Sequence, residues 1–191
     1  MMSESKKVTE KSAFAKSLED LVKKGDRAGL ATLRKGLGKE PGTVTEMYKY
    51  VYSRIPGQTS PFDEKIYFLT ASLFALWHQG KQKLEKDFEG DFGKTFRQIS
   101  KNSESESIKE RFTAIINSHF DDLPNHLRHA VSLAKSKDVA INWSFLLEDL
   151  KWWNNDDKRV QRKWMKSFLQ EEKTELSQTE GTQKEEEQDE D

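Results

Sequence analysis

The sequence predicts an all-α protein, and three observations lead to that prediction. Apolar residues have helical spacing along nearly the whole chain, with no convincing stretch of strict alternation. No run approaches the roughly 20 apolar residues that a membrane-spanning helix needs. The 191 residues include no cysteine, which excludes disulfides, thiolate zinc sites and cysteine nucleophiles. We therefore expect helices that are stabilised by packing alone.

The first two helices are delimited by ordinary start and stop signals. Phe14 and Leu18 belong to the apolar face of the first helix, which Gly25 is expected to end. Asp26 can then cap a second helix, because its short carboxylate side chain can accept a hydrogen bond from a free backbone N–H group of the first turn. The second helix is expected to end near two glycines, Gly36 and Gly38.

Two further helices begin at capping patterns. Thr43 and Glu46 have the spacing of a capping box, which predicts a third helix. Ser60 and Asp63, with a proline directly after the serine, predict the start of a fourth. Its apolar stripe continues over residues 62–76, so we expect it to be the central core helix.

A polar run at residues 100–107 separates these helices from four more, which follow within about sixty residues. The short connections predict a small antiparallel bundle. We therefore expect one helical bundle at 10–100 and a second at 105–169. Large rings in a small bundle are usually core, although an exposed ring could stack on a base. Four tryptophans lie in the second bundle: Trp143, Trp152, Trp153 and Trp164.

Charge is distributed unevenly along the chain. Residues 170–191 contain ten acids and two bases, a net charge of −8; subtracting this from the total of −1 leaves residues 1–169 at +7. The acidic tail has little to bury and is expected to be disordered. A basic body often faces an anionic partner, although the excess charge could serve solubility alone.

Basic residues cluster at two places. On the last predicted helix, Val160, Trp164 and Phe168 fall in one sector and the basic residues gather on the opposite face. Such side chains can neutralise phosphates of any nucleic-acid sequence. The basic residues of this helix are Lys158, Arg159, Arg162, Lys163 and Lys166, and those of the second helix are Arg27, Arg34 and Lys35.

Patterns for catalysis and metal binding are weak. Asp122, His126 and His129 have i, i+4, i+7 spacing, which would place a carboxylate and two imidazoles on one helical face. A zinc centre needs further ligands, so solvated surface histidines are the favoured interpretation and no metal or cofactor is predicted. The sequence has no glycine-rich phosphate loop and no serine nucleophile elbow, so no enzyme is predicted, although an unrecognised kind stays open.

Several short strings occur in an order that is typical of one family. The strings are Arg27 to Gly38, Ser72 to Ala75, Phe92 to Phe96, Lys109 to Phe112, Leu123 to Val131, Ile141 to Trp143, Leu146 to Leu150 with Trp153, and Val160 to Trp164 with Phe168. On these residues the chain resembles the CasB family, the small subunit of the type I-E CRISPR effector complex Cascade. The resemblance covers residues 12–169.

This resemblance implies a helical, two-bundle protein without catalytic activity, cofactor, membrane contact or small-molecule substrate. Its expected partners are other Cascade subunits, a second copy of itself, guide RNA and target DNA, in the cytoplasm. It would hold the target and displaced DNA strands while guide RNA pairs with the target. Basic family positions match Arg34, Lys35, Arg111 and Arg128, whereas the turn at 117–122 has fewer arginines than the family pattern.

A helical protein–protein adaptor is the alternative from a different class. In an adaptor, the amphipathic helices would bury partner surfaces, and the basic residues would only keep the chain in solution. Binding of the tail-truncated chain to single-stranded DNA or RNA distinguishes the two. A Cascade subunit should bind in a salt-sensitive and sequence-independent way, whereas an adaptor should show no such binding.

The tail charge generates a first testable prediction. Removal of residues 172–191 should strengthen binding to single-stranded DNA at low salt, because a segment rich in acids can screen the basic body. Fluorescence anisotropy with the full-length and truncated chains measures this. Equal affinities at low salt would show that the tail does not mask the binding surface.

Overall fold

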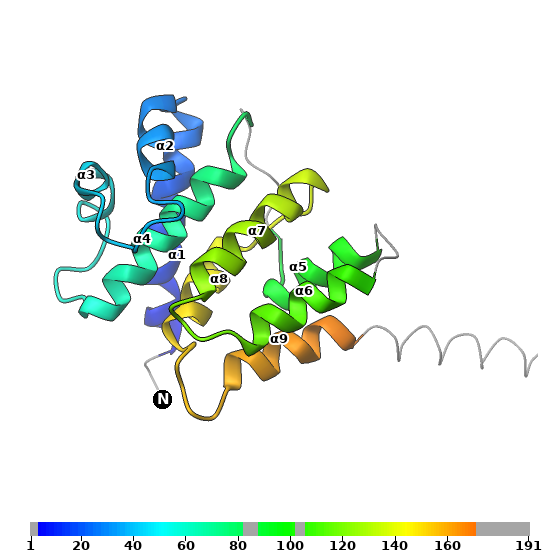
Figure 1. Ribbon diagram of the computed structural model, residues 1–191. Coiled ribbons are helices and arrows are strands. Elements are labelled where there is room, and N and C mark those ends of the chain that lie inside the picture. Colours follow the sequence, from blue (N-terminus) through cyan, green and yellow to red (C-terminus); the bar gives the residue numbers. More distant parts are fainter. Residues whose placement is uncertain (1–3, 82–87, 102–105, 171–191) are drawn as a thin grey trace, which may run out of the picture.

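The structure is a computed structural model that describes residues 4–81, 88–101 and 106–170, with side chains from residue 13 onward. Within these ranges it contains nine α-helices, one 3₁₀ helix and no strand, which confirms the predicted all-α class (Figure 1). None of the helices in the described part of the chain has the length and hydropathy needed to cross a membrane. The predicted acidic tail lies outside the described residues except for Gln170.

Helices make up most of the described part of the chain. In chain order they are α1 (Glu4–Lys23), α2 (Arg27–Arg34), the 3₁₀ helix η1 (Thr45–Met47), α3 (Tyr48–Val51), α4 (Pro61–Trp77), α5 (Phe92–Lys101), α6 (Glu106–Asn117), α7 (Leu123–Ser136), α8 (Trp143–Lys151) and α9 (Arg159–Leu169).

Two of the predicted helix starts are confirmed by their cap hydrogen bonds. Asp26 Oδ1 accepts from the backbone N–H of Gly29 at 2.7 Å and begins α2. Ser60 Oγ accepts from the backbone N–H of Asp63 at 3.1 Å and begins α4. Gly25 separates α1 from α2 with a φ of +65°, a conformation that glycine adopts without strain.

The predicted capping box at Thr43 is wrong. The Thr43 hydroxyl donates to the carbonyl oxygen of Glu40 at 2.7 Å, and the Glu46 carboxylate pairs with Lys35. The helical segment begins instead as a 3₁₀ turn after Val44, which provides no side-chain cap. Both side chains of the expected box therefore have other partners.

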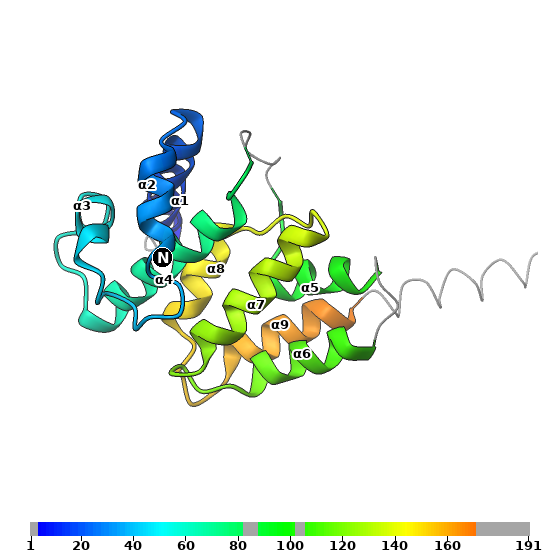
Figure 2. The ribbon, with the colours of Figure 1, turned by 45° about the horizontal axis from the view of Figure 1, so that its top comes forward.

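Helix α4 is the central helix of the first half, as predicted. All of its residues from Ile66 to Ala75 are buried, because α2, α7 and α8 pack around it (Figures 1 and 2). Helix α1 packs on α2 and α8. The first and second halves of the chain are therefore in direct contact through α1 and α4.

Helices α5, α6 and α9 lie side by side and form a second layer (Figures 1 and 2). The α5 and α9 backbones meet at Gly93, where an added Cβ would lie 2.0 Å from the carbonyl oxygen of Trp164. Buried apolar side chains form one cluster that extends from Phe14 to Trp164. The division into bundles at 10–100 and 105–169 stays a prediction.

Aromatic rings fill the space between α5, α6 and α9. Phe96 stacks on Phe112 with ring centroids 5.0 Å apart, and Phe112 contacts Phe168 at 4.7 Å. Trp164 is fully buried and lies 5.1 Å from Trp153. These contacts orient α9 so that its opposite face, which carries the basic residues, is directed to solvent.

The close approach at Gly93 generates a second prediction. Gly93→Ala should lower the free energy of unfolding by about 2 kcal/mol, because an overpacking cost of about 3 kcal/mol exceeds the roughly 1 kcal/mol that alanine gains in helix propensity. Urea unfolding followed by circular dichroism measures the change. Gly57→Ala is the matched control, since nothing lies within 4 Å of its added Cβ. A Gly93→Ala variant as stable as this control would contradict the backbone contact.

Candidate nucleic-acid interface

Three cations converge where the C-terminal end of α2 meets α7. Arg34 Nη1 donates to the carbonyl oxygen of Ala75 at 3.4 Å, which holds the guanidinium beside the end of α4. Arg128 reaches back to the chain after α2, since its Nη1 lies 2.9 Å from the position of an added Cβ on Gly38. Lys135 lies seven residues after Arg128 on α7 and therefore on the same face. We call Arg34, Arg128 and Lys135 the α2–α7 cluster.

Lys135 lies close to other positive charges. Partial burial lowers the pKa of Lys135, and the positive charges of Arg34 and Lys81 lower it further. Lys81 itself pairs with Asp138 at 2.5 Å and lies over the Trp77 ring. Like charges held together in this way favour a bound anion, which would offset their repulsion.

Sequence reasoning identified Arg34 and Arg128 but missed Lys135. Their convergence depends on the packing of both α2 and α7 on α4, which residue spacing does not show. The i, i+7 spacing of Arg128 and Lys135 was the available signal. Arg27 is exposed and lies on the same face of α2 as Arg34, seven residues earlier.

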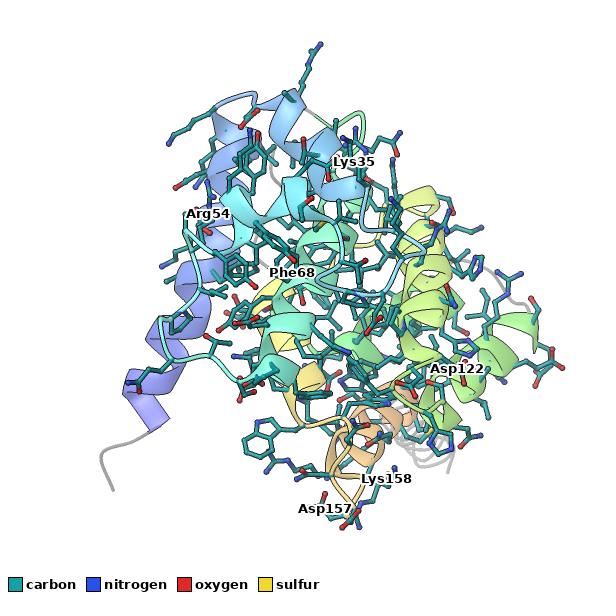
Figure 3. All side chains as sticks on the ribbon, turned by 60° about the vertical axis from the view of Figure 1, so that its left-hand side comes forward. Lys35, Arg54, Phe68, Asp122, Asp157 and Lys158 are labelled. Carbon is teal, nitrogen blue, oxygen red and sulfur yellow. The ribbon has the colours of Figure 1, made fainter. Side chains whose placement is uncertain are left out.

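Lys35 is occupied by an ion pair with Glu46 at 3.1 Å, and both side chains are more than half exposed. Such surface pairs are weak, so the pair leaves Lys35 able to exchange its partner for a phosphate. Figure 3 shows Lys35 and Lys158 at opposite ends of the molecule. The two basic clusters predicted from the sequence are therefore separate surfaces.

The second basic surface surrounds the start of α9. Lys158 precedes the helix with a φ of 50°, and Arg159 places its guanidinium carbon 4.0 Å from the centre of the Trp152 ring. Arg162 donates to the carbonyl oxygen of Asp157. Lys158, Arg159, Arg162 and Lys166 are all exposed. We call these four residues the α9 cluster.

Trp152 is the exception among the tryptophans of the second half. Its side chain is 37% exposed, whereas Trp143, Trp153 and Trp164 are buried. The Arg159 guanidinium covers one part of the ring, an arrangement stabilised by cation–π attraction. An aromatic ring beside several cations is also the combination that single-stranded nucleic acids contact.

Lys163 differs from its neighbours because it holds a buried carboxylate. Its Nζ lies 2.5 and 2.8 Å from the two carboxylate oxygens of Asp149, and the Trp164 indole N–H donates to Asp149 at 2.7 Å. Burial raises the pKa of Asp149, while the hydrogen bonds from Lys163 and Trp164 act in the opposite direction. Lys163 is thus a structural partner as well as a surface cation.

Arg111 is exposed on α6, which packs beside α9. Among the described residues, two of the ten predicted contact residues form an ion pair, Lys35 with Glu46 and Lys163 with Asp149. The other eight carry a charge that no carboxylate in the described ranges neutralises.

Two of the four histidines lie on α7, close in sequence to Asp122. Asp122 precedes α7, and His126 and His129 lie on its first two turns. Within the ranges that the structure describes, no group of three or more histidine, cysteine, aspartate or glutamate side chains is placed to hold a metal ion.

Comparison with known proteins assigns the family. The profile of CRISPR-associated protein Cse2 matches residues 29–168. The chain belongs to the Cse2 family. A Cse2 protein from Thermus thermophilus is 27% identical over 144 residues, which cover 74% of this chain and 78% of the relative.

Solved structures agree with this assignment. The crystal structure of M. ruber CasB is 28% identical and has a TM-score of 0.71, with coverage of 88% of this chain and 97% of CasB. A chain of a CRISPR RNA-guided surveillance complex has a TM-score of 0.76 at 22% identity, with coverage of 90% and 98%. The CasB family predicted from the sequence is thereby confirmed.

The buried carboxylate of Asp149 generates a third prediction. Lys163→Met should lower the free energy of unfolding by about 1–3 kcal/mol at pH 7, because the buried charge loses its ionic partner. The pKa of Asp149 is already raised in the folded state, so its ionisation costs stability as pH rises through that pKa. Loss of Lys163 should raise this pKa further, and the deficit of the variant should shrink on acidification below the folded pKa.

Chemical unfolding at several pH values tests this expectation. Lys166→Met is the control, because Lys166 is exposed on the same helix and its replacement should change stability by no more than about 0.5 kcal/mol. A deficit of Lys163→Met that is independent of pH would show that Asp149 does not carry the effect.

Proposed function

We propose that this Cse2 chain is a non-catalytic subunit of a type I-E Cascade surveillance complex, in which it binds the nucleic-acid backbone and stabilises the target and displaced DNA strands. Family membership and the fold shared with a chain of a CRISPR RNA-guided surveillance complex support a place in such an assembly. The proposed partners are other Cascade subunits, a second copy of the chain, guide RNA and target DNA.

The α2–α7 cluster carries the nucleic-acid part of the proposal. Arg34 belongs to α2 whereas Arg128 and Lys135 belong to α7, and the charged groups that lower the pKa of Lys135 are both positive. A strand that places phosphates at this surface would offset the repulsion and release counterions. Such contacts carry no sequence information, which is the property required of a subunit that acts on any target.

The α9 cluster offers a second surface of the same kind. Its cations and the partly exposed Trp152 ring lie together, and Arg27, Lys35 and Arg111 add charge elsewhere on the surface. In an RNA-guided complex, base pairing selects the target, and backbone contacts shift a nearly balanced exchange of strands. We propose that the two basic surfaces supply such contacts.

A protein–protein adaptor is the second candidate, and exposed apolar side chains favour it. Phe145 is 47% exposed and Trp152 is 37% exposed, and the two lie seven residues apart on one side of α8. A partner protein could cover this stripe without any contact to nucleic acid. The two proposals differ in what the basic residues are expected to do in isolation.

The fourth prediction distinguishes them. Arg128→Gln with Lys135→Gln should weaken binding to single-stranded DNA of every sequence, and should reduce the slope of log K against log salt by about 0.7 for each lost contact. Anisotropy titrations at several salt concentrations measure both quantities. The fold should be retained, because Arg128 is exposed and replacement of the partly buried Lys135 removes a charge that its positive neighbours repel.

A second double variant controls for net charge. Lys49→Gln with Lys65→Gln removes the same charge from α3 and α4, where Lys65 pairs with Glu40 at 2.7 Å and Lys49 lies over the Tyr50 ring. It should reduce affinity much less than the α2–α7 variant. Equal losses would show that only total charge matters, and absence of any DNA binding by the unaltered chain would favour the adaptor.

A further inference from the structure

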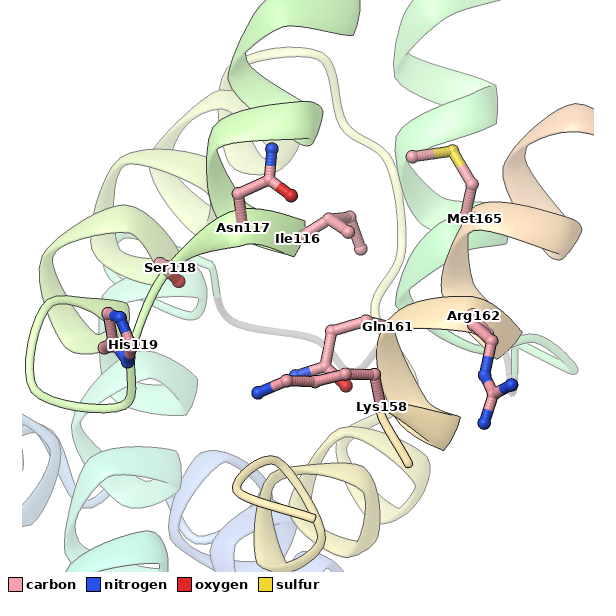
Figure 4. Close-up of a pocket in the computed structure, with 8 residues that line it drawn as sticks. All are labelled: Ile116, Asn117, Ser118, His119, Lys158, Gln161, Arg162 and Met165. Carbon is pink, nitrogen blue, oxygen red and sulfur yellow. The ribbon is translucent and has the colours of Figure 1, made fainter. Parts of the chain in front are cut away.

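A pocket between α6 and α9 combines two cations of the α9 cluster with six residues that the backbone contacts proposed above do not use. It is an open hollow of about 420 Å³ at the C-terminal end of α6 and the start of α9 (Figure 4). This volume falls within the roughly 300–1,000 Å³ that small-molecule sites occupy. Ile116 and Met165 provide apolar walls, and Lys158, Arg162 and His119 provide nitrogen groups.

The α9 side of the pocket is built by one helical face. Lys158, Gln161, Arg162 and Met165 follow i, i+3, i+4, i+7 spacing, so they lie on the same side of the helix. The opposite wall is the end of α6 and the loop that carries His119 (Figure 4). No carboxylate is among the described residues that line the pocket. The lining therefore favours a ligand that carries negative charge.

A buried hydrogen-bond acceptor lies in this lining. Gln161 is only 4% exposed, and its Nε2 donates to the carbonyl oxygen of Trp153 at 2.9 Å. This bond fixes the orientation of the amide, because a flipped amide would place two acceptor oxygens together. Gln161 Oε1 is buried and has no hydrogen-bond partner within the described part of the chain. A buried amide oxygen without a donor is unfavourable and is rare in folded proteins.

Lys158 lines the same pocket from the start of α9. Figure 4 shows the side chains of Gln161 and Lys158 both directed from the start of α9 toward the His119 loop. Lys158 is exposed and forms no ion pair with any described residue, so its flexible side chain is free to turn toward a phosphate. Such a movement would uncover the Gln161 amide to a ligand.

We propose that this pocket binds the base of one unpaired nucleotide. An exocyclic amino group of the base donates to Gln161 Oε1, the phosphate contacts Lys158 and Arg162, and the ring lies between Ile116 and Met165. The inference rests on the proposed nucleic-acid binding and adds a base contact to it. Recognition of a base by ring contact and edge hydrogen bonds is the general mode for unpaired strands.

The chemistry of the acceptor predicts which bases fit. Cytosine and adenine carry an amino group, whereas thymine has a carbonyl oxygen where cytosine has its amine. A thymine bound in the same way would place this oxygen against Gln161 Oε1. The pocket should therefore prefer cytosine over thymine and adenine over purine, the analogue that lacks only the amine.

Competition between homopolymeric single strands of equal length tests the inference on the full chain. Deoxycytidine strands should bind about three- to tenfold more tightly than deoxythymidine strands, as one net hydrogen bond provides. Deoxyadenosine strands should bind more tightly than strands of the purine analogue by a similar factor. Absence of both preferences would overturn the inference, and the proposed backbone binding would stand if all four strands still bound.

Protein variants assign the preference to the pocket. Gln161→Met removes the acceptor, and Met165→Trp fills the pocket without changing Gln161; each should abolish the base preference. Leu169→Trp is the matched control, since Leu169 lies one turn further along α9, is 48% exposed and is outside the pocket. It should retain the preference.

Two further outcomes would also overturn the inference. One is a preference that persists in Met165→Trp, which would place the base contact elsewhere. The other is a Met165→Trp chain that keeps its base preference but no longer associates with partner subunits. This result would show that the pocket contacts a protein. If Gln161→Met did not fold, the strand comparison and Met165→Trp would still decide.

Discussion

The burial of Trp164 determines how the second half of the protein is arranged. Gly93 allows the α5 backbone to touch the backbone of Trp164, and Phe92 and Trp153 pack on its ring with centroids 5.0 and 5.1 Å away. Its indole N–H binds the buried Asp149 carboxylate. Because Trp164 belongs to α9, these contacts fix the rotation of that helix about its own axis. The direction in which the α9 cluster faces is therefore a consequence of core packing.

The α2–α7 cluster exists only in the folded chain, because it joins residues from distant parts of the sequence. Arg34 is held by the carbonyl oxygen of Ala75, and Lys135 by the packing of α7 on α4. Folding must therefore overcome the repulsion between these charges. An anion that binds the cluster is expected to stabilise the folded state, with a gain that grows with its concentration relative to its dissociation constant. Stability and ligand binding are thus linked at this surface.

Local patterns predicted the fold class and most helices, whereas long-range partners were not predictable. The caps at Asp26 and Ser60 need only residues three positions away, and both formed. The Thr43 box failed because the Thr43 hydroxyl bonds the Glu40 carbonyl oxygen and Glu46 pairs with Lys35, the residue after α2. In the same way, helical projection identified the basic face of α9 but could not show that Lys163 meets Asp149, fourteen residues earlier. Contacts with other parts of the fold therefore determine which of the predicted cations form an ion pair.

The uneven burial of the tryptophans gives the protein an internal optical probe. Trp77, Trp143, Trp153 and Trp164 are at most 7% exposed, whereas Trp152 is 37% exposed and lies beneath the Arg159 guanidinium. A dissolved quencher such as iodide reaches the emission of Trp152 far more readily than that of the other four indoles. The quenchable part of the native fluorescence thus reports on the junction of α8 and α9, without any label attached to the chain.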